Sequence, residues 1–189
     1  NLFSAVLFSA AVYTNAQGIE QQLVVENRVN DAKQQDKPYV ILISADGFRY
    51  DYAKKHDAKN LQNFAKNGVE AKAMYPSYPS ITFPNHYTIV TGLYPSHHGL
   101  VGNQMLEEAT GDRYSLGNRE AVINPKWYGG TPIWNLAEEN KMLSACYYWP
   151  GSEAPINGMF PTYSYKYSEK SPIDYRIQEV VNWLQLPAE

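Results

Sequence analysis

The first half of the chain combines apolar runs with one helical pattern. Residues 39–44, within "PYVILISADGF", form a continuous apolar run that is typical of a strand buried on both faces. The run ends abruptly at Asp46 and Gly47. Residues 59–67 place apolar side chains on one helical face before a glycine, and residues 69–74 resume an extended pattern. This strand–helix–strand order predicts the start of an α/β sheet.

The second half continues the mixed pattern. The segment "NHYTIVTGLYP" predicts a helix that ends at Gly92, and residues 103–116 predict a hairpin with its turn at residues 110–112. A Thr-Pro pair opens a predicted helix over residues 131–141, and residues 142–149 predict a strand. A last helix begins after Ser171, the predicted N-cap. Its apolar face consists of Ile173, Ile177, Val180 and Leu184.

The N-terminal segment differs from the rest of the chain. Residues 2–13 are apolar but too short to span a bilayer, which needs about 20 apolar residues. Small residues follow, so residues 1–16 are interpreted as the remnant of a secretory signal peptide, with a short buried strand or helix as the alternative. Residues 17–36 are expected to be a polar lead-in. Residues 37–189 are expected to belong to one folded domain.

Composition limits the function classes. The chain has 189 residues, 44% of them apolar and 19% charged, as in one globular domain. Its formal net charge of −3 and lack of a basic run argue against a stable nucleic-acid partner but not against an enzyme acting on a nucleotide. The single cysteine, Cys146, excludes an internal disulfide and is expected to be buried. An exported chain without disulfides indicates a bacterial periplasmic or secreted protein.

Two residues are candidates for chemistry on local rules. Asp46 follows the predicted buried strand, where α/β proteins place ligands, and a divalent metal would offset the cost of burying its charge. On the Asp-Gly pair alone, a turn cap is the favoured alternative. Thr82, in "SITFPNHY", precedes the predicted helix and would be an ordinary N-cap.

The same position also suits a nucleophile. Free N–H groups of a first helical turn bind phosphoryl groups, and Pro84 falls where a missing N–H does no harm. A bound metal could lower the pKa of the Thr82 hydroxyl enough for attack on phosphorus. Taken alone, the local pattern favours the cap.

Three segments together change this balance. "ILISADGFRYDY", "YPSYPSITFPNHYTIVTGLYPSHHGLVGN" and "YYWPGSE" closely resemble the nucleotide pyrophosphatase/phosphodiesterase family of the alkaline phosphatase superfamily. The likeness runs from about Lys37 to Pro187. It implies an α/β fold, an alkaline-phosphatase-like three-layer α/β/α arrangement with a mostly parallel central sheet, of which this chain covers only the N-terminal part.

The resemblance also implies roles for individual residues. Asp46 matches a metal ligand, and Thr82 matches the nucleophile, whose oxygen also meets the metal site. Asn103 matches the residue that hydrogen-bonds a non-bridging phosphoryl oxygen; without the match it would be a plain turn residue. The nucleobase pocket corresponds to Phe83, Trp149 and Tyr167, for which ordinary packing is the alternative.

The histidines of this region are interpreted as structural. His86 lies one helical turn from Thr82 and could face the site. The family's ligating histidines lie much further along the chain, so His86, His97 and His98 are not expected to bind metal.

The implied cofactors are two divalent metal ions, expected to be zinc, which clamp the attacking and leaving oxygens. The family holds them mostly through a downstream Asp-x-x-Gly-His segment, an Asp-His pair and a late His. The chain stops short of that region at "WLQLPAE" and is therefore expected to be a fragment cut at both ends.

The implied reaction is hydrolysis of a phosphodiester or pyrophosphate bond through a phosphothreonyl intermediate. A phosphomonoesterase of the superfamily is a rival, but its Lys-x-Arg pair is absent between Asn103 and Trp149. A choline-type lipid head-group phosphodiesterase and an inactive binding relative stay open as alternatives.

The isolated 189-residue chain should have little activity, because most of the implied metal ligands lie outside it. Zinc titration with a chromogenic thymidine-monophosphate ester measures this directly. Robust turnover by the isolated chain would refute the expectation.

Overall fold

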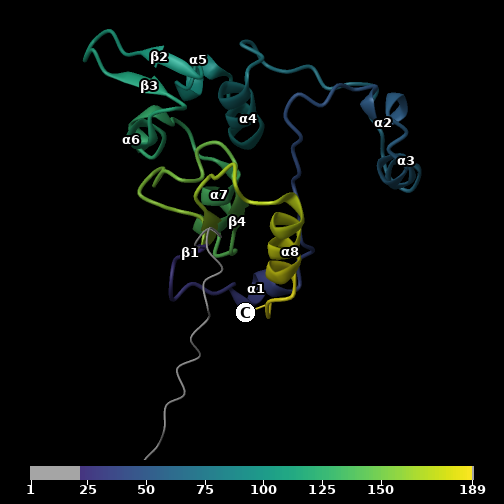
Figure 1. Cartoon of the computed structure of the whole chain (residues 1–189). Coiled ribbons are helices and arrows are strands. Elements are labelled where there is room, and N and C mark those ends of the chain that lie inside the picture. Colours follow the sequence, from purple (N-terminus) through teal and green to yellow (C-terminus); the bar gives the residue numbers. More distant parts are fainter. Residues whose placement is uncertain (1–21, 189) are drawn as a thin grey trace, which may run out of the picture.

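The computed structural model describes residues 22–188. Its elements are β1 (Gln22–Val24), α1 (Ala32–Gln35), α2 (Tyr52–Lys55), α3 (Lys59–Lys66), α4 (Thr82–Thr91), α5 (Pro95–His98), β2 (Gln104–Leu106), β3 (Arg113–Ser115), α6 (Arg119–Val122), the 3-10 helix η1 (Pro125–Trp127), α7 (Ile133–Glu139), β4 (Ala145–Tyr147), β5 (Tyr163–Tyr165) and α8 (Ile173–Leu184). Figure 1 shows α2 and α3 apart from the other elements, with the β2–β3 hairpin projecting on the opposite side.

The larger sheet has the strand order β1-β5-β4. Strand β5 runs parallel to β4 and antiparallel to β1, so Ser164 lies opposite both Cys146 and Leu23. Helix α8 packs beside β4, where the Trp183 ring lies 5.8 Å from that of Tyr147. The predicted α/β class therefore holds within the described residues, although their three-stranded sheet is of mixed direction and not mostly parallel.

The core includes Tyr87 and Val90 of α4 and is rich in aromatic side chains. The Tyr87 ring is fully buried and meets those of His98 and Tyr128 edge-on, with ring centroids 4.9 and 5.4 Å apart. Tyr128 donates its hydroxyl to the Val122 carbonyl at 2.8 Å, and its hydroxyl oxygen lies 3.0 Å from that of Tyr114. These edge-on pairs add stability beyond the area that they bury.

The predicted strand at residues 39–44 is wrong. The segment is irregular, and the side chains of Val40 and Ile43 are 85% and 84% exposed. A strand buried on both faces needs partner strands, and no strand of residues 22–188 pairs with this segment. The extended segment at residues 69–74 likewise forms no strand.

The predictions for the N-terminal part of the chain have different outcomes. The predicted signal-peptide remnant, residues 1–16, lies outside the described residues. The polar lead-in contains β1 and α1, because β1 finds a partner in the distant strand β5. Its pairing residues are far apart in the sequence, so no local pattern indicates the strand.

Several sequence predictions are confirmed. They are the hairpin, the helices at α3, α4, α7 and α8, the strand at β4 and the burial of Cys146.

The predicted packing face of α8 is wrong, since Ile173 and Ile177 are exposed. The helix instead uses Glu179, which accepts a hydrogen bond from the Tyr165 hydroxyl at 2.6 Å, and Trp183. Its N-cap is Pro172 and not Ser171.

One buried carboxylate joins the elements around this sheet. Glu138 Oε1 accepts the N–H and hydroxyl of Ser144, at 2.9 and 2.7 Å, and the same two groups of Thr162, at 2.9 and 2.7 Å. Its Oε2 lies 3.2 Å from Arg28 Nη1. The side chain thereby links α7 to the starts of β4 and β5 and to the segment after β1. A buried charge is tolerated because it is both paired and hydrogen-bonded.

Replacing this carboxylate should destabilise the fold strongly. Glu138→Ala leaves four donors without their acceptor and removes the carboxylate partner of Arg28, so we expect a loss of about 3–5 kcal/mol in the free energy of unfolding. Urea denaturation measures it. The neighbouring Glu139→Ala, at an exposed position, is the control. Equal midpoints for the two variants would contradict the assigned role.

Candidate active site

The N-terminus of α4 brings Thr82 and Asp46 together. Thr82 is the first helical residue, and the N-cap is Ile81, whose backbone is extended and whose side chain makes no cap bond. The interpretation of Thr82 as the N-cap is therefore wrong. Its hydroxyl instead donates to Asp46 Oδ2 at 3.0 Å.

Asp46 lies in a tight turn. The N–H of Phe48 donates to the Ala45 carbonyl at 3.2 Å, and Gly47 has a φ of 68°, which residues with a Cβ rarely adopt. The predicted burial of Asp46 at the end of a strand is not observed, because the residue is exposed. Its carboxylate reaches Thr82 all the same.

Asn103 lies at the same helix end. Its Oδ1 accepts the Phe83 N–H at 3.0 Å, and its main-chain carbonyl accepts the Leu116 N–H at 3.2 Å, just beyond the β2–β3 ladder. With Oδ1 acting as an acceptor, Nδ2 is the end of the amide that can donate to a ligand.

The helix N-terminus offers fewer free donors than the sequence pattern predicts. The Phe83 N–H is already bonded to Asn103, and Pro84 has no N–H. The Thr82 N–H and Asn103 Nδ2 are the remaining donors that this end of α4 can present to an anion.

Two of the three predicted pocket residues adjoin this helix end. Phe83 is half-buried, with its ring 6.3 Å from that of Tyr114. The Trp149 indole donates to the His86 carbonyl at 3.1 Å, and its ring meets the His86 ring edge-on at 5.7 Å.

Tyr167 lies in a different environment. It is 56% exposed, its N–H donates to Glu153 Oε1 at 2.7 Å, and its ring lies 5.1 Å from that of Tyr148. Glu153 also forms a bidentate ion pair with Arg119. No ring contact within the described residues joins Tyr167 to Phe83 or Trp149.

The three histidines occupy different surroundings. His98 is buried, with Nε2 3.0 Å from Thr88 Oγ1 and Nδ1 accepting the Leu100 N–H at 3.2 Å, and burial lowers its pKa. His97 is exposed. His86 lies between Thr82 and Ser44, a contact that the sequence pattern does not indicate because Ser44 is 42 residues away.

The described residues supply only part of a metal-binding site. A carboxylate and a hydroxyl oxygen 3.0 Å apart are suitable oxygen donors for a divalent cation and could occupy neighbouring positions around it. Within residues 22–188, however, no group of three or more His, Cys, Asp and Glu side chains could hold a metal ion.

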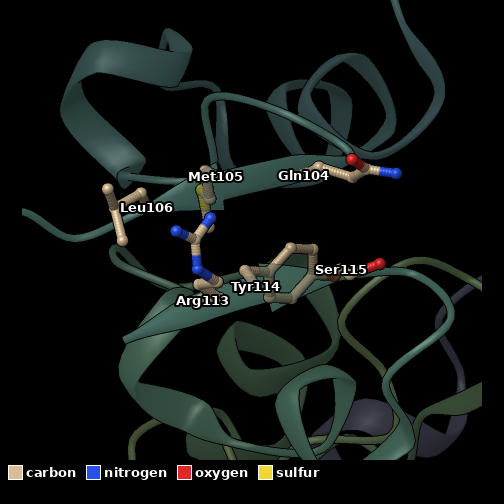
Figure 2. Close-up of a pocket in the computed structure, with 6 residues that line it drawn as sticks. All are labelled: Gln104, Met105, Leu106, Arg113, Tyr114 and Ser115. Atoms are coloured by element: carbon tan, nitrogen blue, oxygen red, sulfur yellow. The ribbon is translucent and has the colours of Figure 1, made fainter. Parts of the chain in front are cut away.

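A shallow hollow lies on the β2–β3 hairpin (Figure 2), lined by Gln104, Met105, Leu106, Arg113, Tyr114 and Ser115. It contains none of the predicted site residues, although Asn103 immediately precedes β2.

In the part of the chain that the structure describes, no helix has the length and apolar character needed to cross a membrane.

Comparison with known proteins identifies the family. The model described as type I phosphodiesterase/nucleotide pyrophosphatase matches residues 40–189. The chain belongs to this family. The predicted resemblance is thereby confirmed.

Several relatives show the extent of the match. Ectonucleotide pyrophosphatase/phosphodiesterase family member 3 of Mus musculus is 44% identical over 80% of this chain and 18% of its own length. The venom phosphodiesterase of Naja atra is 42% identical over the same shares. An uncharacterized pyrophosphatase/phosphodiesterase of Schizosaccharomyces pombe is 43% identical over 78% of this chain and 31% of its own length. The chain thus spans less than one third of these relatives.

A solved structure confirms the predicted fold class. Murine ectonucleotide pyrophosphatase/phosphodiesterase 5, in an inactive threonine-to-alanine form in complex with AMP, matches with a TM-score of 0.72 and 32% identity. The match covers 76% of this chain and 38% of that one. It supports an alkaline-phosphatase-like α/β domain, of which the small described sheet is a part.

A change at Gly102 should displace Asn103. A Cβ at this position would lie 2.6 Å from the backbone oxygen of Gln104, so the turn that carries Asn103 must shift in Gly102→Ala. We expect the Phe83 amide to exchange with solvent about threefold to tenfold faster, as one hydrogen bond is lost. Gly117→Ala, where a Cβ has room, is the control. Unchanged protection of Phe83 in Gly102→Ala would count against this geometry.

Proposed function

We propose that this chain carries the nucleophile of a metal-dependent nucleotide pyrophosphatase/phosphodiesterase. The observation that carries the proposal is the hydrogen bond from the Thr82 hydroxyl to Asp46, beside an amide of Asn103 whose donor end can meet a ligand. The names of the relatives support a substrate with a phosphodiester or pyrophosphate bond. Because the chain spans only part of their length, activity is assigned to a longer protein that contains it.

In the proposed reaction, Thr82 Oγ1 attacks phosphorus. A bond forms between this oxygen and the phosphoryl group, and the bond to the leaving alcohol or phosphate breaks. Asp46 accepts the hydrogen bond of the hydroxyl and so directs an oxygen lone pair toward the substrate. The hydroxyl proton is lost to solvent as the new bond forms, and the leaving oxygen takes up a proton from solvent. Water then hydrolyses the phosphothreonyl group and restores Thr82.

Asn103 has the role of an electrostatic stabiliser. Its Oδ1 is held by the Phe83 N–H, so Nδ2 is presented in a fixed direction. A preorganised donor of this kind lowers the energy of the charge that develops on a non-bridging phosphoryl oxygen. The N-terminal end of the α4 dipole adds to the same field.

Metal ions belong to the proposal. Asp46 and Thr82 would each supply an oxygen ligand, and two divalent ions, of which zinc is the expected kind, would draw further ligands from outside this chain. When bound, such an ion lowers the pKa of the hydroxyl that it touches and offsets phosphoryl charge.

Phe83 and Trp149 are proposed to contact the nucleobase. Both adjoin the first two turns of α4, so a base stacked on them would hold the phosphorus near Thr82. The AMP complex of the murine relative supports a nucleotide. Tyr167 stays in the proposal as an exposed pocket residue whose main-chain N–H is bonded to Glu153.

We further propose that the protein is exported. Relatives named as ectonucleotide and venom enzymes support an extracellular or secreted location. Bacterial origin and the periplasm stay predictions from the sequence.

The sharpest test replaces Thr82 in the full-length protein. Thr82→Ala removes the attacking oxygen, and we expect hydrolysis of a thymidine-monophosphate nitrophenyl diester to fall by about a thousandfold or more, with the fold unchanged. Thr82→Ser retains a hydroxyl and should keep measurable turnover. Far-UV circular dichroism controls for folding.

Two results would overturn the proposal. Thr82→Ala with a tenth or more of wild-type turnover would exclude the threonine nucleophile. A strong preference of the wild type for nitrophenyl phosphate would instead indicate a monoesterase, and preference for a choline phosphodiester would indicate a lipid head-group enzyme.

A further inference from the structure

The His86 ring bridges two parts of the candidate site. Its Nδ1 lies 2.7 Å from the Thr82 carbonyl oxygen, and its Nε2 lies 2.9 Å from Ser44 Oγ. A carbonyl only accepts, so Nδ1 carries a hydrogen, and in the neutral ring Nε2 accepts from the Ser44 hydroxyl. The residue is 8% exposed, so water competes little for these bonds.

The Ser44–His86 contact helps to hold an exposed segment of the chain in place. Residues 39–48 are exposed and irregular. In the described part of the chain, two hydrogen bonds join this segment to the rest, namely Ser44 to His86 and Asp46 to Thr82. Only Ala45 separates Ser44 from Asp46, so a contact that holds Ser44 also restricts where the Asp46 carboxylate can lie.

The bridge is supported from the other side. Trp149 donates its indole N–H to the His86 carbonyl and packs edge-on against the His86 ring. The ring is therefore held in one orientation, as expected of a side chain that positions another group.

We propose that His86 is a positioning residue that, through Ser44, sets the place of Asp46 relative to the Thr82 hydroxyl. This rests on the proposed function, in which Asp46 and Thr82 share a metal and Thr82 attacks phosphorus. His86 touches neither substrate nor metal in this scheme. Its effect reaches the reaction through the two groups that it orients.

His98, the last residue of α5, shows what a purely structural histidine does when it packs against α4. Its ring contacts Thr88 of α4 and the Leu100 N–H. It joins α4 to the segment after α5 at a distance from Thr82 along the helix. Thr88→Val is therefore a useful control, since it removes the two part-buried hydrogen bonds of the Thr88 hydroxyl, with His98 and with Ser77, outside the site.

The test uses the full-length protein and Zn²⁺ as the probe. Ser44→Ala leaves the His86 ring and Trp149 in place. We expect kcat for the thymidine diester to fall about tenfold with KM within about twofold, and calorimetric Zn²⁺ affinity to fall about tenfold, as for residues that orient metal ligands. Thr88→Val should lower the unfolding midpoint and leave kcat and Zn²⁺ affinity within about twofold.

Substitutions of His86 itself distinguish its Nδ1 contact with Thr82 from its Nε2 contact with Ser44. His86→Gln can place an acceptor near the Nε2 position and should stay within about threefold of wild type. His86→Asn reaches only the Nδ1 position and should be as impaired as Ser44→Ala. Adding Ser44→Ala to His86→Asn should cause no further loss, because both remove the same link.

The two proposals fail in different ways. A wild type that binds Zn²⁺ but does not hydrolyse the diester overturns the proposed function, and the Zn²⁺ comparison still decides the role of His86. If wild type and Ser44→Ala bind Zn²⁺ with equal affinity, or if neither binds it, the positioning role is overturned. So does a Ser44→Ala protein that matches Thr88→Val in kcat.

Discussion

Tyr87 lies wholly out of solvent at the middle of α4, edge-on to the rings of His98 and Tyr128. Burying so large an aromatic side chain fixes both the depth and the rotation of the helix. Thr82 and Phe83 occupy the first turn of the same helix, so their directions follow from this packing. The candidate site therefore depends on a helix whose position the core determines.

The site itself is made of single hydrogen bonds between segments. Asn103 reaches α4 from the start of the β2–β3 hairpin, and Asp46 reaches it from an exposed turn. Each bond is modest on its own, since groups near the surface exchange it with water. The buried His86 ring adds a second connection to the Asp46 segment. The loops that carry Asp46 and Asn103 are thus held to the well-packed helix by few bonds, and this is the physical basis for the proposed positioning role of His86.

A second buried centre holds the sheet. The Glu138 carboxylate gathers donors from residues that precede β4 and β5, and it pairs with Arg28 beyond β1. Its position explains how two short strands and a distant N-terminal strand form one sheet. The aromatic side chains of β4 and β5 then contact Trp183 of α8.

Much of the local structure follows from the sequence by itself, because hydrophobic period, proline and glycine act over a few residues. The helices at α4, α7 and α8 and the β2–β3 hairpin are examples. The motifs around Asp46, Thr82 and Asn103 likewise sufficed to indicate the family. Tertiary structure alone decided that residues 39–44 are not a strand, that α8 packs through Glu179 and Trp183, and that Ser44 meets His86. These outcomes depend on contacts between segments that lie tens of residues apart in the sequence. A local pattern of polar and apolar side chains does not indicate which distant segments will meet.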